Sequence, residues 1–191
     1  MFRQFRPALI SVLFFTVLTG VFYPFVVTGI AGVIFPHRAQ GSLILQGGRV
    51  IGSELIGQNF SKPEYFHPRP SAAGNGYDAS NSGGSNLGPT SQKLMDQIKQ
   101  RAEDYRRENG LSPDAELPAD AVTASASGLD PHISPANADL QAARVARARN
   151  MSLAEVHDLI QQATDGRSLG FLGDDGVNVL ELNLALDRIK P

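Results

Sequence analysis

A serine, an acid and a histidine lie close together in the middle of the chain, at Ser127, Asp130 and His132. These are the side-chain types of a nucleophilic triad, in which the histidine takes the serine proton and the acid orients the histidine. Closeness in sequence argues little for such a site, because triad members meet through the fold, and no Gly-x-Ser-x-Gly turn accompanies this serine. We therefore expect the stretch from Asp130 to His132 to form a capped turn before a helix that begins at Pro135.

Metal chemistry has little support in the sequence. A zinc site needs histidine, cysteine or carboxylate ligands at paired spacings. No cysteine is present, and the histidines are scattered at His37, His67, His132 and His157. We expect no firmly bound metal or cofactor.

The acidic residues are distributed unevenly. All 19 follow residue 53, and the stretch from Glu108 to Asp139 holds acids but no lysine or arginine. An acidic surface attracts cations within a Debye length of about 8 Å at physiological salt. The candidates for such a surface are Asp114, Glu116 and Asp120; a solvated surface that aids solubility is the alternative. The basic trio that follows, Arg144, Arg147 and Arg149, suits ion pairs with Asp139 and Glu155 or contact with a partner.

These side chains are carried by a chain with a long apolar segment near its N-terminus. No residue between Pro7 and Pro36 is charged, which leaves a mostly apolar run of 28 residues at 8–35. About 20 such residues cross a bilayer, whereas the apolar core of a secretory signal is about 7 to 15 residues long. We predict a retained transmembrane helix at residues 8–35, rather than a signal peptide cleaved after Ala31.

Small residues and a proline recur every fourth position in this segment. Close approach of small residues is a main source of helix association in lipid, where no hydrophobic drive acts between helices. We expect a kink at the proline. The packing candidates are Thr16, Gly20, Pro24, Thr28 and Gly32, although a strict four-residue stripe drifts around a helix.

The charges beside the segment predict its orientation. Arg3 and Arg6 form a denser cluster than Arg38 and Arg49, which places residues 1–7 in the cytoplasm and residues 36–191 outside. One helix without an ionisable residue cannot conduct an ion alone. The chain is therefore an accessory subunit or an anchored domain.

The remainder reads as an α/β or α+β domain with a small sheet and about three to four helices. The alternation of glycines and short apolar runs predicts strands within residues 41–60, and the composition of 70–90 predicts a long loop with a turn at Asn75-Gly76. Spacing and capping residues predict helices at 91–109, at 135 to about 149, and from Ser152 to near Gly166. We expect a short strand at 177–180 and a helix after it.

Several blocks in this domain occur together, in order, in one known family. They are Gly52–Gln58, Tyr65-Phe66, Arg69–Ala72, Ser82–Thr90, Thr123–Pro135 and Val177–Leu186. In these blocks the chain resembles the C subunit of the Kdp potassium-transporting ATPase, over nearly all of its length after residue 50.

The resemblance implies a place in a membrane complex and a set of partners. These are a channel-like potassium-translocating subunit, a P-type catalytic subunit that binds ATP and Mg, and a small single-span subunit. The implied location is the bacterial inner membrane. The near-neutral net charge of −2 gives no surface for nucleic acid.

Kdp C subunits are described as helping the catalytic subunit to bind ATP, and Ser82-Gly-Gly-Ser85 is similar to the Ser-Gly-Gly-Gln motif of ABC-type ATPases. The loop lacks a lysine, and neither a Walker A nor an Asp-Lys-Thr-Gly motif is present. A loop outside the membrane would also face no ATP pool, so we expect partner contact rather than nucleotide contact. The motif-loop candidates are Ser82, Gly83, Gly84, Ser85, Asn86, Ser127, Asp130 and His132.

The sequence therefore predicts a non-catalytic accessory subunit of the potassium pump. It would assemble or stabilise the complex, and it would raise the ATP affinity of the catalytic subunit or shape the outer potassium entrance. The alternative is a membrane-anchored extracytoplasmic hydrolase or binding protein that acts alone.

Overall fold

A computed structural model describes residues 2–189 of the 191-residue chain. The chain divides into two compact units, one ending at Ser53 and the other beginning at Glu54. The first unit holds a long helical segment, a short helix and a hairpin. The second holds five helices and a small sheet within the described residues.

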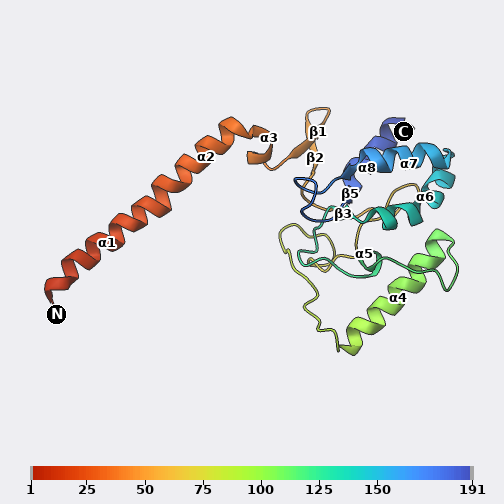
Figure 1. The fold of residues 1–191 in the computed structure, drawn as a ribbon, viewed down its shortest axis with the longest axis horizontal. Coiled ribbons are helices and arrows are strands. Elements are labelled where there is room, and N and C mark those ends of the chain that lie inside the picture. The colour runs from red at the N-terminus through yellow and green to blue at the C-terminus, as the bar shows by residue number, and fades with distance from the viewer. Residues whose placement is uncertain (1, 190–191) are drawn as a thin grey trace. The chain divides into compact units, whose positions relative to one another are not determined.

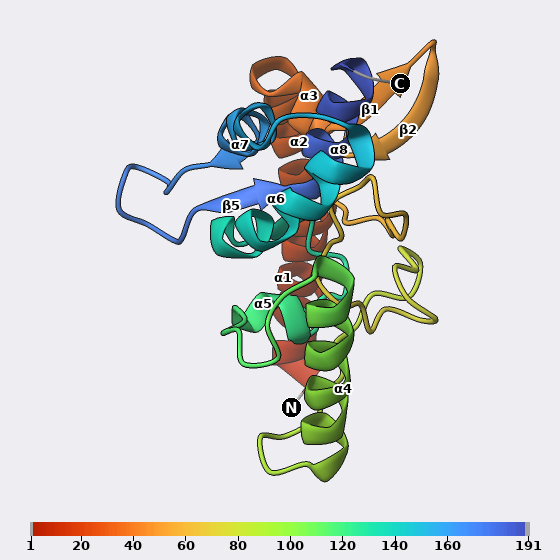
Figure 2. The ribbon, with the colours of Figure 1, turned by 90° about the vertical axis from the view of Figure 1, so that its right-hand side faces the viewer.

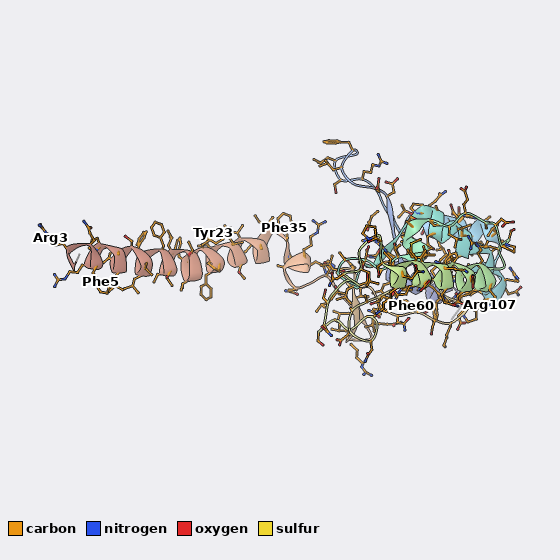
Figure 3. The ribbon with its side chains drawn as sticks, turned by 90° about the horizontal axis from the view of Figure 1, so that it is seen from below. Arg3, Phe5, Tyr23, Phe35, Phe60 and Arg107 are labelled. Carbon is orange, nitrogen blue, oxygen red and sulfur yellow. The ribbon has the colours of Figure 1, made fainter. Side chains whose placement is uncertain are left out.

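The long helical segment covers the predicted apolar run except for its last residue, Phe35. A 3₁₀ turn at Phe2–Gln4 leads into α1 (Phe5–Val17), a π-helical turn (Leu18–Phe22) and α2 (Tyr23–Ile34). Together, Phe5–Ile34 is the one helix among residues 2–189 that is long and apolar enough to cross a membrane. Figure 3 labels Arg3, Phe5, Tyr23 and Phe35 along this segment, with their side chains pointing outward from the helix axis.

The π-helical turn stands where the sequence predicts a kink. Pro24 has no N–H, and its ring crowds the carbonyl of Gly20 in a regular α-helix. A π-helical turn bonds each N–H to the carbonyl five residues back and so widens the helix; here the Tyr23 N–H donates to the carbonyl of Leu18. The ribbon runs from α1 into α2 without a sharp break in Figure 1, and a π-helical turn stands where the kink was expected.

The predicted strands of residues 41–60 form a hairpin after the short helix α3 (Pro36–Ala39). Strand β1 (Leu43–Gln46) pairs antiparallel with β2 (Arg49–Ser53). The two-residue loop between them is Gly47-Gly48, and both glycines have positive φ, at 59° and 78°. Such a loop matches the twist of the strands and demands residues that tolerate positive φ.

The second unit is built on helices whose ends follow the predicted capping residues. Helix α4 (Gln92–Asn109) ends at Gly110 in the left-handed conformation, and α6 (Pro135–Arg149) begins at the N-cap Ser134. Helix α7 (Leu153–Gln162) begins with a capping box made by Ser152 and Glu155. The remaining helices are α5 (Ala119–Val122) and α8 (Val179–Ile189).

Two predicted boundaries near the C-terminal part are corrected. Helix α7 ends at Gln162 rather than near Gly166, because Thr164 enters a strand and its hydroxyl donates to the carbonyl of Ile160. The strand β5 (Gly176–Asn178) ends two residues earlier than predicted, because Asn178 caps the next helix by accepting from the N–H of Glu181. The predicted order of strand and then helix is confirmed.

A three-stranded antiparallel sheet with the order β3-β5-β4 joins distant parts of the chain. Strand β3 (His132–Ile133) pairs with β5, and β4 (Thr164–Asp165) pairs with its other side. Helices α6, α7 and α8 gather around β5 in Figure 1. An antiparallel sheet with helices grouped on it is an α+β arrangement, within the predicted class.

The core lies between α6, α7, α8 and the sheet. Helix α6 presents alanines and Val145 to it, and these small side chains let neighbouring helices approach closely. The core also contains Phe66, which is 0% exposed and comes from a segment with no helix or strand. The buried apolar residues are Phe66, Ile133, Ala138, Ala142, Val145, Ala146, Val156, Leu159, Ile160, Ala163, Val177, Val179, Leu182 and Leu186.

The segment that carries Phe66, residues 59–70, is here called the strap. The side chain of Asn183 bonds both backbone groups of Phe66, at 2.8 and 3.0 Å. The side chain of Gln141 bonds both backbone groups of His67, at 2.7 and 3.0 Å. Helices α6 and α8 thus supply the hydrogen bonds that a neighbouring strand would otherwise provide.

Arg144 completes the attachment of the strap. Its guanidinium donates to the carbonyls of Pro63 and Tyr65 and to the side chains of Asn109 and Gln141. Burial lowers the pKa of Arg144, yet arginine stays charged because its ordinary pKa exceeds about 12. Of the two readings of the basic trio, intramolecular contact is therefore shown for Arg144, and also for Arg149, whose guanidinium lies 2.6 Å from the carboxylate of Asp187. Asp139, one of the expected partners, faces His157 instead.

Candidate functional site

The motif loops at 69–72, 82–90 and 123–135 meet in space. The Gly83 N–H and the Ser82 hydroxyl both donate to the carbonyl of Ser127, each at 2.9 Å. The Ser71 hydroxyl donates to the carbonyl of Gly128 at 2.7 Å. Residues far apart in sequence thus form one surface, which we call the loop cluster (residues 69–90 and 123–132).

Glycine is required where these loops touch. A Cβ on Gly128 would lie 2.6 Å from the backbone nitrogen of Ala73, and Gly128 also has a positive φ of 67°. A Cβ on Gly84 would lie 3.0 Å from the carbonyl oxygen of Ala126. The backbones therefore approach too closely for most side chains, and this fixes the shape of the loop cluster.

Tyr77 and Arg69 hold the outer side of the loop cluster. The Tyr77 hydroxyl donates to the carbonyl of Arg69, and its N–H donates to the Ser71 hydroxyl at 2.8 Å. Burial raises the pKa of Tyr77 well above its usual range, so the phenol keeps its proton and stays a donor. The Arg69 guanidinium bonds the carboxylate of Asp130 at 2.8 Å.

The candidate triad residues are used for structure. Asp130 accepts from the N–H of His132 at 3.0 Å, which is the predicted capped turn. The Ser127 hydroxyl accepts from the N–H of Leu129 at 3.1 Å. The His132 ring faces Asp165, with Nε2 2.9 Å from the carboxylate. Serine and histidine therefore turn to different partners, and the loop shows no nucleophile activated by a base.

The loop at residues 82–86 likewise makes its backbone contacts within the chain. The Gly83 N–H, which would have to point at a phosphate in a nucleotide cradle, donates instead to Ser127. Ser85 and Asn86 are exposed, and Asn86 has a positive φ of 52°. This geometry offers a shaped surface, and contact of the loop with a partner rather than with ATP stays a prediction.

The three acidic candidates do not form one group. Asp114 and Glu116 are exposed. Asp120 instead accepts from the N–H and hydroxyl of Ser134 and from the amide of Asn137, at 2.8 to 2.9 Å. Its carboxylate fastens the start of α6, so only the other two are left to act as free surface charges.

An open cleft of about 640 Å³ adjoins the loop cluster. Among the described residues its charged lining is mostly acidic, with Arg69 as the only arginine or lysine, and the turn around His132 also lines it. Across residues 2–189, no group of three or more histidine, aspartate or glutamate side chains is arranged to hold a metal ion. The acidic lining residues are Asp120, Asp130, Asp165, Asp174 and Asp175.

One wall of the cleft comes from a feature that the sequence analysis missed, the segment 166–175 between β4 and β5. We call it the arm; it projects beyond α6 and α7 in Figure 2. Its tip carries Leu169 and Phe171, which are 82% and 69% exposed. Apolar residues set between Gly166, Gly170 and Gly173 are a signal that could have revealed it.

The packing candidates of the long helix lie in the other unit. All five of them are exposed. A Cβ added at Gly20 or Gly32 would meet nothing within 4 Å. Contact with another helix therefore stays a prediction for Thr16, Gly20, Pro24, Thr28 and Gly32.

Comparisons with known proteins give a consistent result. The family model described as "KdpC: K+-transporting ATPase, c chain" matches residues 5–188. The chain is 57% identical over 187 residues to the potassium-transporting ATPase KdpC subunit of Mycobacterium tuberculosis H37Rv, covering 98% of this chain and 99% of that one.

Two further relatives match over the whole chain and carry the same name. The subunit of Beijerinckia indica is 57% identical over 191 residues, covering 100% of this chain and 96% of that one. The subunit of Methylococcus capsulatus is 54% identical over 191 residues, covering 100% of both chains.

Proposed function

The chain belongs to the KdpC family of K+-transporting ATPase c chains, and from this premise we propose that it is a non-catalytic accessory subunit that assembles or stabilises the complex. Its partners in this proposal are a channel-like potassium-translocating subunit, a P-type catalytic subunit that holds ATP and Mg, and a small single-span subunit. The solitary anchored hydrolase, the alternative from the sequence, is not favoured by this membership.

The construction of the loop cluster carries the proposal. Turns and contacts between loops engage Ser71, Ser127 and Asp130, and the ring of His132 faces Asp165. Glycines bring its backbones too close together for the cluster to change shape easily. A rigid surface of this kind suits docking against another protein, because little conformational freedom is lost on binding.

Removal of the chain from the complex tests the proposal. We expect the potassium-stimulated ATPase activity to fall and the other subunits to separate during detergent purification when this chain is absent. Adding the chain back should restore both. If the purified chain instead ran as a monomer with hydrolase activity of its own, the accessory role would be wrong.

We also propose that the second unit lies outside the bacterial inner membrane, with the N-terminus in the cytoplasm. The positive charges at Arg3 and Arg6 support this orientation. The chain has no cysteine, so Ser85→Cys and Asp114→Cys each give a single reactive thiol. Labelling of intact cells by a membrane-impermeant maleimide is expected, with the cysteine-free chain as control.

The side of the membrane decides how ATP use is affected. Labelling only after lysis would contradict the orientation and would favour direct contact between the loop at 82–86 and nucleotide. With the unit outside, an increase in the ATP affinity of the catalytic subunit has to pass through the long helix or through the partners.

The exposed acids support a role at the outer potassium entrance. Asp114 and Glu116 are the two candidates whose carboxylates are exposed. We expect Asp114→Asn with Glu116→Gln to weaken the apparent potassium affinity on the order of a few-fold at low salt, and less at high salt. Unchanged affinity in a fully assembled complex would remove this role. Glu103→Gln, an exposed acid on α4, is the control.

A further inference from the structure

The arm presents apolar side chains that the fold itself does not bury. Leu169 and Phe171 lie at its tip, and Leu172 is also half exposed. Figures 2 and 3 both show the arm standing clear of the helices of its unit. A cluster of exposed apolar residues ringed by polar ones is typical of an interaction site.

The arm has a defined shape. The N–H of Ser168 and the carbonyl of Leu172 are joined at 2.9 Å, and so are the carbonyl of Ser168 and the N–H of Leu172. At its base, the N–H of Arg167 donates to the carboxylate of Asp175 at 3.2 Å, next to the pairing of β4 with β5. A tip organised in this way loses little entropy on binding.

Leu169 occupies an unfavourable backbone conformation. Its φ is +55°, a left-handed conformation that is energetically unfavourable for a residue with a Cβ. Asparagine or glycine would adopt this conformation more easily. The fold gains no core contact in return, because the side chain is 82% exposed.

Charges around the tip indicate what kind of surface receives it. Three acids, Asp165, Asp174 and Asp175, flank the tip against one base, Arg167, and Asp174 lies 3.6 Å from that base. Segments that bind membrane surfaces carry lysine and arginine, which attract anionic headgroups. Two arms meeting about a twofold axis would bring acidic rims together. An apolar pocket with a basic rim is the complementary surface.

We propose that the arm inserts Leu169 and Phe171 into an apolar pocket, rimmed by lysine or arginine, on another protein subunit of the same ATPase complex. This proposal rests on the accessory role given above. It adds the element that makes the contact and the chemistry of the surface that receives it. The cleft lined by Asp165 and Asp174 would then face the basic rim.

The first test removes the apolar tip without adding backbone strain. In Leu169→Asn with Phe171→Ser, asparagine still accepts the positive φ, so the arm keeps its shape. Buried aromatic anchors contribute about 2 kcal/mol or more, and we expect the variant to leave the purified complex about thirtyfold faster than the unchanged chain. Met95→Ser, an exposed apolar position on α4, is the matched control and should have no effect.

The second test reverses a charge on the rim. The side chain of Asp174 is 97% exposed and lies 3.6 Å from the guanidinium of Arg167. Asp174→Lys should speed dissociation severalfold at low salt and less at high salt. Glu103→Lys makes the same charge change on α4 and should leave the dissociation rate unchanged.

The third test identifies the occupant. A photo-reactive phenylalanine analogue in place of Phe171 should cross-link, in the purified complex, to a peptide of another subunit that contains lysine or arginine. Cross-linking to lipid alone or to a second copy of this chain would overturn the proposal. So would an arm variant that stays in the complex as well as the unchanged chain does.

The tests separate this proposal from the accessory role. If the unchanged chain stays in the complex and the arm variants stay equally well, only the arm proposal fails. If the unchanged chain never remains with the other subunits, the accessory role fails and the arm proposal fails with it.

Discussion

The strap and the arm are both segments without a helix or strand of their own, and each carries a phenylalanine, but the fold treats them in opposite ways. Phe66 of the strap is 0% exposed, whereas Phe171 of the arm is 69% exposed. The strap is fastened by side chains of α6 and α8. The arm is held by hydrogen bonds between its own backbone groups and by Asp175, which accepts from the N–H of Arg167.

This difference separates residues that stabilise the chain from residues available to another molecule. Folding already buries the apolar surface of the strap, so removing that surface changes only the stability of the chain itself. The apolar surface of the arm contributes to stability only when a partner covers it. Substitutions in the strap should therefore change the free energy of unfolding, whereas substitutions in the arm should change assembly with a partner.

The largest effect is expected from removing the buried ring. Phe66→Ala should lower the free energy of unfolding by about 3 to 5 kcal/mol, because it leaves a cavity in the core. Phe171→Ala should change it by no more than about 0.5 kcal/mol. Denaturant unfolding of the full chain in detergent, followed by circular dichroism, measures both. Equal losses in the two variants would abolish the distinction.

The next effect concerns how the strap is fastened. Asn183→Leu keeps the size of the side chain but leaves the N–H and carbonyl of Phe66 without their partners. Each unpaired buried group costs about 1 to 3 kcal/mol and two are left here, so we expect a loss of at least about 2 kcal/mol. Gln161→Leu, at an exposed position of α7, is the control in the same unfolding experiment.

Two glycines allow the arm to be compared with the loop cluster as well, since Gly170 lies in the arm and Gly128 in the loop cluster. Gly128 and Gly170 both have positive φ, but a Cβ would collide with Ala73 only at Gly128. Gly128→Ala should cost about 2 kcal/mol or more and Gly170→Ala about 1 kcal/mol. Limited proteolysis should cut the loop at 70–90 faster in the first variant only. Similar cutting in both would mean that the close approach is not what fixes the cluster.

The smallest expected effect is a pH dependence of the free energy of unfolding, which arises where Glu108 contacts His67 of the strap. The hydrogen bond from His67 is the main cause that lowers the pKa of Glu108 below its usual 4.5. A lowered folded pKa adds stability that is present above pH 4.5 and is lost as the pH falls through the folded value. Glu108→Gln should therefore flatten the loss of stability in acid, by roughly 0.5 kcal/mol since the pair is partly exposed. Unfolding measured between pH 6 and pH 3 tests this, with Glu103→Gln as control.

The sequence predicted the features that depend on neighbouring residues. The helix starts at Ser134 and Ser152 and the stop at Gly110 follow from capping, which acts within one turn. The Asx turn at Asp130 is equally local. Such contacts can be read from the order of residue types.

Contacts between distant residues could not be predicted in this way. Asn183 and Phe66 are 117 positions apart, and no periodicity links an amide on one helix to the backbone of a strap. Asp120 reads as a free acid until Ser134 and Asn137 are placed beside it. The arm was missed because its residues fit neither a helical nor a strand period.

The π-helical turn at Leu18–Phe22 acts as a phase correction for the small residues of the long helix. In a regular α-helix each residue advances by about 100°, so sixteen residues from Thr16 to Gly32 leave the stripe about 160° out of phase. The π-helical turn holds one extra residue, which reduces this angular offset by about 100° and leaves about 60° between Thr16 and Gly32. In a regular α-helix this four-residue repeat would wind around the axis. The extra residue of the π-helical turn brings the small residues back toward one side of the helix.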